Sequence, residues 1–192
     1  DFKEQHLVTR ADVSKPFDLQ EYYDHPDRYR ADFFRHLPHL TLLVNCIYWE
    51  PKYPRLITNE QLAELYDGDR GPRLRVIGEI TCDVEGSIEC LVRCTDPGNP
   101  VYVFEAATGL THDGVAGRGP VVLGVDFLPC ELPVDSSVHF SRSMSPWIPA
   151  IAGADFTGSL SDSGLPPELV RATILWRGQL TEPYRYLHEF VE

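Results

Sequence analysis

The predicted fold is organised around residues 74–89, LRVIGEITCDVEGSIE. The apolar run at its start is short, rich in β-branched residues and bounded by charged residues, which favours a buried strand over a helix. In an open α/β sheet the ligand crevice lies beyond the carboxyl ends of the strands. We therefore expect Asp83, which follows the strand, to lie at the lip of such a crevice. The alternative is that Asp83, Glu85 and Glu89 form a solvated loop.

The segment before this stretch completes a βαβ unit. LTLLVNCIY, residues 40–48, is a continuous apolar run of the kind found in strands buried on both faces. Pro51 and Pro54 then specify a rigid loop at the carboxyl end of that strand. Thr58 and Gln61 fit a capping box that begins a helix. Strand, loop, helix and strand in this order predict parallel strands and half of a doubly wound sheet.

Shorter elements are expected on either side of this unit. We predict a short helix at 19–23 and a longer one at 26–36, and strands at 101–104 and 121–125. The glycine-rich segment 111–120 resembles a phosphate loop only superficially, because no helix follows to bind phosphate at its N-terminus. We therefore predict that 111–120 is a surface loop or lid.

The last third of the chain predicts helices. One begins near Pro133 and extends to 144, with a kink or a second start at Ser145-Pro146. Another begins at Pro166-Pro167 and carries apolar residues to Ile174, in a region that Gly178 closes. Thr181 is expected to cap the last helix, whose apolar stripe is formed by Tyr184, Leu187 and Val191. The expected division is therefore 1–132 for the sheet and 133–192 for the C-terminal helices.

Composition excludes several classes of function. The chain has 192 residues with 43% hydrophobic residues, enough for one domain with a core. Its 29 acidic and 17 basic residues give a formal charge of -12, which disfavours nucleic acid and anionic membranes as partners. No apolar run reaches the roughly 18 residues of a membrane span, and the first residues are too polar for a signal peptide. We expect a soluble, cytoplasmic protein, and its start at Asp1 suggests a processed or excised piece.

The five cysteines are odd in number and contain no Cys-x-x-Cys pair. Most lie in or beside apolar runs, so we predict reduced thiols in the core of an intracellular protein. Zinc bound by Cys90, Cys94 and a histidine is the alternative. We expect no metal, because the paired Cys-x-x-Cys arrangement of structural zinc sites is missing.

Three stretches carry a resemblance to a known family: NCIYWEPKYPRLIT (45–58), EITCDVEGSIE (79–89) and VDFLPCELPVDSS (125–137). In this order they resemble the C-terminal half of lysine-2-oxoglutarate reductase, the saccharopine-forming domain of the bifunctional aminoadipic semialdehyde synthase family. The resemblance extends from residue 22 to the last helix. More distantly, the stretches are similar to alanine dehydrogenase and to lysine-forming saccharopine dehydrogenase.

The resemblance implies a Rossmann-like α/β fold and an oxidoreductase that uses NAD or NADP. Lysine, 2-oxoglutarate and saccharopine are the implied substrates. It implies that Asp83 faces the reacting centre. The implied cofactor-binding residues are Asn45, Ile47, Tyr48, Leu128 and Pro129.

The chain also departs from the family. It contains neither the glycine-rich phosphate loop nor the Lys and His of the acid–base pair, which lie earlier in family members. Glu85-Gly86 stands where relatives often carry two glycines, which puts the backbone conformation at Glu85 in doubt.

Three interpretations remain open. The first is a portion of the reductase that is inactive without its upstream half and associates with the remainder of the enzyme or with a second copy. The second is a standalone binding module on the same scaffold. The third is a related amino-acid dehydrogenase with another substrate.

Overall fold

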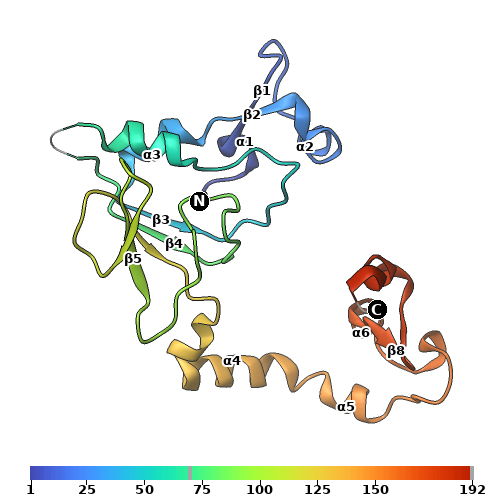
Figure 1. Ribbon diagram of the computed structural model, residues 1–192. Coiled ribbons are helices and arrows are strands. Elements are labelled where there is room, and N and C mark those ends of the chain that lie inside the picture. Colours follow the sequence, from blue (N-terminus) through green and yellow to red (C-terminus); the bar gives the residue numbers. More distant parts are fainter. Residues whose placement is uncertain (69–70, 191–192) are drawn as a thin grey trace. The chain divides into compact units, whose positions relative to one another are not determined.

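The computed structural model describes residues 1–68 and 71–190 (Figure 1). The chain divides into two compact units, Asp1–Glu131 and Leu132–Glu192. The roles predicted for residues 1–132 and 133–192 stay predictions.

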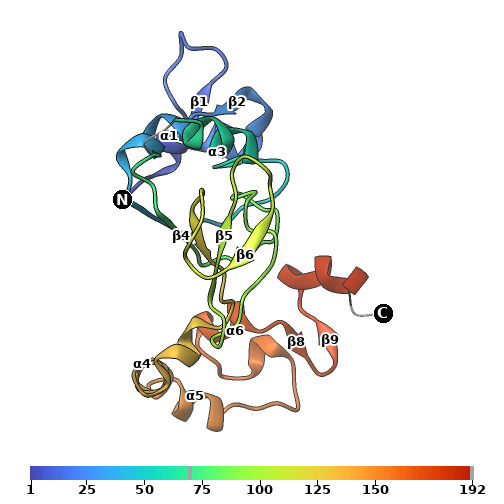
Figure 2. The same ribbon diagram turned by 60° about the vertical axis from the view of Figure 1, so that its left-hand side comes forward.

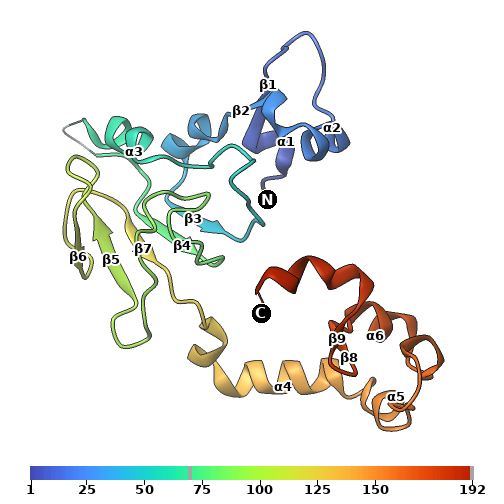
Figure 3. The same ribbon diagram turned by 45° about the vertical axis from the view of Figure 1, so that its right-hand side comes forward.

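The first unit is organised around a five-stranded sheet with the order β3-β4-β7-β5-β6 (Figure 3). Its strands are β3 (Leu42–Asn45), β4 (Val76–Glu79), β5 (Val101–Phe104), β6 (Thr111–Asp113) and β7 (Val121–Leu123). β4 pairs in parallel with both β3 and β7, whereas β5 is antiparallel to β7 and β6. The parallel half of the sheet and its flanking helices confirm the predicted α/β class, part of a Rossmann-like sheet.

The helix between β3 and β4 is α3 (Asn59–Tyr66), and its start confirms the predicted capping box. Thr58 Oγ1 accepts a hydrogen bond from the Gln61 amide at 3.3 Å, and Gln61 Oε1 accepts one from the Thr58 amide at 3.0 Å. At the other end, the Tyr66 hydroxyl donates to the Leu74 carbonyl oxygen. Both ends of α3 are therefore fixed by side-chain hydrogen bonds, and burial raises the pKa of Tyr66 to about 12.

The core lies on one face of the sheet, and this corrects the prediction for β3. Leu43 is buried in the core cluster, but Leu42 and Val44 on the opposite face are 56% and 54% exposed. β3 is the edge strand of the sheet. An apolar run alone does not reveal whether anything covers the second face, so burial on both faces was a wrong prediction.

The N-terminal segment folds differently from the prediction. It contains α1 (Glu4–Leu7), β1 (Val8–Arg10), α2 (Leu19–Asp24), η1 (Pro26–Arg28), β2 (Tyr29–Ala31) and η2 (Phe33–His39). The short helix at 19–23 is confirmed as α2. The helix predicted at 26–36 is wrong, because β2 pairs antiparallel with β1 and Tyr29 packs in a small core with Val8 and Tyr22.

The glycine-rich segment 111–120 is not wholly a loop. β6 pairs with β5, with His112 opposite Val103. Gly119 lies so close to the Phe104 carbonyl group that a Cβ atom would not fit there. The prediction missed β6 because it is a strand only through its pairing with β5. The glycines that suggested a loop are needed where the chain passes close to β5 after β6.

Within its described residues, the second unit contains helices and one hairpin (Figure 2). Its elements are α4 (Pro133–Met144), α5 (Ile148–Ala152), η4 (Leu160–Asp162), α6 (Pro167–Ala172), β8 (Leu175–Trp176), β9 (Gln179–Leu180) and η5 (Glu182–Phe190). α4 confirms the predicted start at Pro133. The chain then restarts as α5, with Trp147 rather than Ser145 as its N-cap residue.

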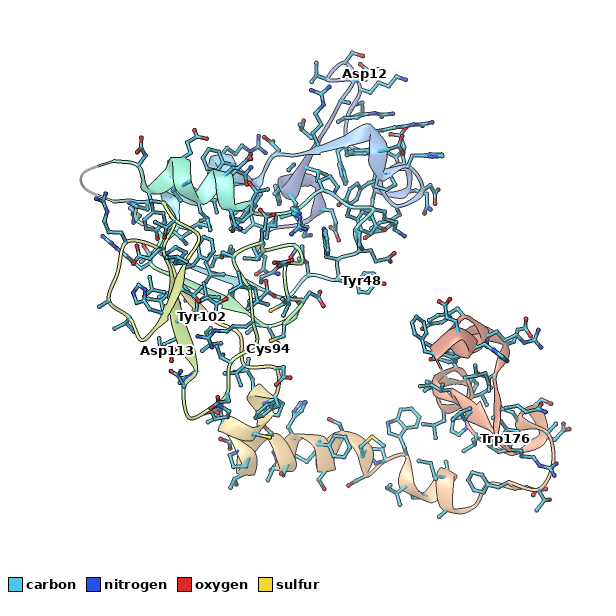
Figure 4. The ribbon with its side chains drawn as sticks, in the orientation of Figure 1. Asp12, Tyr48, Cys94, Tyr102, Asp113 and Trp176 are labelled. Atoms are coloured by element: carbon cyan, nitrogen blue, oxygen red, sulfur yellow. The ribbon has the colours of Figure 1, made fainter. Side chains whose placement is uncertain are left out.

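Gly178 closes a hairpin instead of a helix. Arg177 and Gly178 both have positive φ, 51° and 81°, which suits a two-residue turn between β8 and β9. The Trp176 ring stacks on Phe156 at 5.5 Å (Figure 4). The last predicted helix is the 3-10 helix η5, and Val191 of its expected stripe lies outside the described residues. No helix within residues 1–68 and 71–190 is long and apolar enough to cross a membrane.

Candidate functional site

The carboxyl ends of β3, β4 and β7 lie at one edge of the sheet, because these strands are parallel neighbours. Three segments leave the sheet there: 46–48, 80–83 and 124–129. The Ile80 amide donates to the Asn45 carbonyl oxygen at 2.9 Å, which keeps the first two segments together. This edge is where open α/β sheets bind ligands.

A buried carboxyl group joins the strand ends. Glu79, the last residue of β4, is 1% exposed. Its Oε2 accepts a hydrogen bond from Asn45 Nδ2 at 2.6 Å, and its Oε1 accepts two from the amide and hydroxyl of Thr81. Asn45 Nδ2 also donates to Ser87 Oγ at 2.9 Å. The network fixes both ends of the segment between Thr81 and Ser87.

Burial is the main reason why the pKa of Glu79 is raised above its usual range. Hydrogen bonds from Thr81 and Asn45 oppose this rise, and the nearby charge of Asp83 adds to it. Glu79 and Asp83 are thus two carboxyl groups in one site, one buried and one exposed.

The turn that carries Asp83 is tightly held. The Gly86 amide donates to the Asp83 carbonyl oxygen at 2.8 Å, and a Cβ at Gly86 would lie 2.6 Å from the Cβ of Asp83. Glu85 has a φ of 51°, so the left-handed conformation that glycine favours is kept although the residue is glutamate. Arg55 Nη1 donates to the carbonyl oxygens of Glu85 and Gly86. Asp83 is therefore presented on a fixed turn.

A cavity of about 620 Å³ opens beside the end of β3. Its lining includes Ile47, Tyr48, Trp49, Tyr53 and Arg55. Tyr48 is 82% exposed, and its hydroxyl donates to Glu50 Oε1 at 2.8 Å (Figure 4). The structure thus brings two of the predicted cofactor-binding residues, Ile47 and Tyr48, to one cavity.

The other predicted site residues lie elsewhere. Asn45 is 2% exposed and does not line the cavity, and its amide nitrogen already donates to Glu79 and Ser87. Leu128 and Pro129 belong to the 3-10 helix η3 (Leu128–Glu131) after β7, also outside the cavity. The site roles of these residues and of Asp83 stay predictions.

Two acidic residues at this edge were missed from the sequence. Glu79 could have been noticed as a charged residue within an apolar run. Asp126 follows β7, and its charge contributes to raising the pKa of Cys82. It could have been noticed because it follows a predicted strand just as Asp83 does.

All five cysteines are free thiols, but the prediction of core thiols holds only for Cys90. Cys46, Cys94 and Cys130 are exposed, and Cys82 is half-buried. Cys46, Cys82 and Cys94 lie in irregular segments after β3 and β4, and Cys130 lies in η3. An adjacent apolar run does not ensure burial at such positions. Among the described residues, no group of three or more His, Cys, Asp and Glu side chains could hold a metal ion.

No family model matches the chain, but its sequence is similar to several known proteins. The chain is 37% identical to alpha-aminoadipic semialdehyde synthase of Arabidopsis thaliana, over 95% of this chain and 17% of the relative. It is 30% identical to the mitochondrial alpha-aminoadipic semialdehyde synthase of Bos taurus, over 99% of this chain and 22% of the relative. Saccharopine dehydrogenase [NAD(+), L-lysine-forming] of Schizosaccharomyces pombe is 27% identical, over 74% of this chain and 36% of the relative. The chain therefore spans about a fifth of the length of the first two relatives.

Proposed function

Since the chain belongs to the family of the alpha-aminoadipic semialdehyde synthases and lysine-forming saccharopine dehydrogenases, we propose that it forms part of an oxidoreductase of lysine metabolism. The proposed reaction is the reductive condensation of lysine and 2-oxoglutarate to saccharopine, or its reverse, with NAD or NADP. A cytoplasmic location also stays a prediction, because the mammalian relatives carry the word mitochondrial in their names.

One observation carries the proposal. The carboxyl ends of three parallel strands meet at one edge, and a hydrogen-bonded turn presents the exposed Asp83 there. Substrate and cofactor binding at this edge is the general rule for such sheets.

The residues at this edge fit part of a dinucleotide. The cavity offers apolar and aromatic side chains, including Ile47 and Tyr48, of the kind that line cofactor sites. The chain has no glycine-rich loop for the pyrophosphate, so the fit covers the ring and ribose portion. When bound, the cofactor supplies the hydride that is exchanged with the substrate.

The chain's own residues would orient the substrate and control charge. We assign to Asp83 the electrostatic stabilisation of positive charge on the substrate nitrogen. Glu79 and Ser87 would hold the Asp83 turn through Asn45, which keeps the carboxylate in place during the reaction. Ile47 and Tyr48 would flank the cofactor on one side, and Leu128 and Pro129 on the other.

The experiment is Asp83→Asn in the full polypeptide encoded by the gene, assayed with lysine, 2-oxoglutarate and reduced cofactor. Removing the charge while keeping the shape should lower kcat by about 10²- to 10³-fold. If Asp83 only caps its turn, turnover stays near normal, because Asn also suits turns. The matched control is Asp12→Asn, an exposed aspartate in the loop after β1 (Figure 4), which should leave kcat unchanged.

The other two interpretations give different results in the same assay. A standalone binding module shows no turnover with any 2-oxo acid. A related amino-acid dehydrogenase turns over with another amino acid, such as alanine, but not with lysine.

A further inference from the structure

Two cysteines, Cys82 and Cys94, lie in contact next to the Asp83 turn. Cys82 lies three residues after Glu79, the last residue of β4, and Cys94 lies 12 residues further along the chain. Cys94 Sγ donates to the Cys82 carbonyl oxygen at 3.7 Å, which places the Cys94 thiol against residue 82. Cys94 is exposed to solvent (Figure 4), so a small oxidant can reach the pair.

Hydrogen bonds hold the segments around both cysteines in place. Cys82 Sγ donates to the Glu79 carbonyl oxygen at 3.3 Å. The Thr95 amide donates to the Gly124 carbonyl oxygen at 2.9 Å, which anchors the residue after Cys94 to the end of β7. Between them, the Glu85 amide donates to the Leu91 carbonyl oxygen at 2.7 Å. The segment between Cys82 and Cys94 is therefore already closed by hydrogen bonds. A disulfide between the two residues would need little further ordering of this segment.

We propose that Cys82 and Cys94 are a redox modification site at which an intramolecular disulfide ties the Asp83 turn to the segment before β5. The other three cysteines differ from Cys82 and Cys94 in burial or in position. Cys90 is completely buried, and Cys46 and Cys130 are exposed after β3 and in η3. This site stands whether or not the proposed function holds, because it rests on the two thiols alone.

The chemistry is thiol–disulfide exchange with a low-molecular-weight disulfide. The Cys94 thiolate attacks one sulfur of the small disulfide and displaces one of its halves as a thiolate. The Cys82 thiol loses its proton, attacks the Cys94 sulfur and displaces the second half. Two protein thiols are oxidised to one disulfide, and the small disulfide is reduced by two electrons to two thiols.

The order of attack follows from exposure. Burial, with the neighbouring Cys94 and the charges of Glu79 and Asp126, raises the pKa of Cys82 to about 11. Cys82 is therefore the second thiol to react, and the closing step should be faster at pH 9 than at pH 7.

The test uses the purified chain with Cys46→Ser and Cys130→Ser. These substitutions remove the two other exposed thiols, so three of the five cysteines remain. After reduction and removal of reductant, the protein is incubated with glutathione disulfide. We expect one free thiol, that of Cys90, and a mass lower by two hydrogen atoms. Three free thiols, or a stable glutathione adduct on Cys94, would overturn the proposal.

Wild-type chain provides a second measurement that needs no substitution. Trypsin cleaves after Arg75, Arg93 and Arg118, so the disulfide should link peptides 76–93 and 94–118. Fragmentation of the linked pair distinguishes Cys82 from Cys90. The control, Cys94→Ser in the same chain, should give no link involving 76–93. A link from Cys90 would also contradict the assignment.

Discussion

At the scale of single residues, the buried carboxyl group of Glu79 determines how the ends of β3 and β4 are joined. An ionised or neutral carboxyl group can accept hydrogen bonds from both Asn45 and Thr81, as observed. A glutamine at this position would present an amide nitrogen to one of these donors. The substitution therefore leaves a buried donor without an acceptor.

We predict that Glu79→Gln lowers the free energy of unfolding by about 1 to 3 kcal/mol at pH 7. Because burial raises the pKa of Glu79 above 4.5, its contribution to stability is full below that pH and falls as pH rises through the raised value. The difference in the free energy of unfolding between wild type and variant should therefore be larger at pH 4 than at pH 7. Urea unfolding at both pH values measures it. Glu64→Gln, an exposed change on α3, serves as the control, and a gap that widens with pH would contradict the assignment.

Glu85 gives a second prediction at this scale. Its φ of 51° is costly for a residue with a Cβ, by roughly 1 to 2 kcal/mol, whereas glycine adopts it freely. Glycine also loses more backbone entropy on folding, so Glu85→Gly should raise stability by about 1 kcal/mol or less. Glu85→Ala keeps the Cβ and should stay near wild type. A thermal melt in which both variants shift equally would show that the side chain, not the backbone, matters.

At the scale of elements, α3 depends on its N-terminal cap. We predict that Thr58→Ala lowers the free energy of unfolding by about 0.5 to 2 kcal/mol, because the Gln61 amide loses its acceptor. Thr58→Ser keeps the hydroxyl and should recover most of the loss. Chemical denaturation of the three proteins measures this. Equal losses for Ala and Ser would mean that the methyl group of Thr58, not its hydroxyl, supports the helix.

Elements that are defined by local signals could be predicted from the sequence. α3 has its capping box, α4 has Pro133 at its start, and β4 has a bounded β-branched run. β2 and β6 could not be predicted, because each is a strand only through its partner, β1 or β5. The exposed face of β3 is likewise a property of the whole sheet.

The candidate site could also be predicted only in part. The position of Asp83 after β4 followed from the pattern of a strand and a turn. The link between Asn45, Glu79 and Ser87 could not be predicted, because these residues are 34 and 42 positions apart in sequence and meet only when β3 and β4 pair. Buried hydrogen-bond networks of this kind depend on the sheet register.

At the scale of the whole molecule, cofactor binding should require more than this chain. The glycine-rich loop and helix N-terminus that hold the pyrophosphate supply much of the binding energy in dinucleotide sites. We predict that the isolated chain binds neither NADH nor NADPH with a dissociation constant in the micromolar range. Isothermal titration calorimetry measures this, and micromolar binding would contradict the partial fit.

The uncovered face of β3 leads to a prediction about association. Leu42 and Val44 expose apolar side chains on the same face of the edge strand, since side chains two residues apart point the same way. Within the described residues, no strand pairs with the outer edge of β3. An unpaired strand edge and an exposed apolar face both favour association with another chain. The formal charge of -12 opposes such contact, and salt weakens that opposition.

We therefore predict that the isolated chain self-associates with rising concentration, and more strongly in high salt than in low salt. Sedimentation velocity across a concentration series measures the association. Leu42→Lys with Val44→Lys should shift the chain toward monomer by placing charges on the face. Leu110→Lys, at an exposed turn residue next to β6, is the control and should leave the association unchanged. A monomer at every concentration would mean that the charge of the chain outweighs this apolar face, while equal effects of both variants would point to net charge rather than to β3.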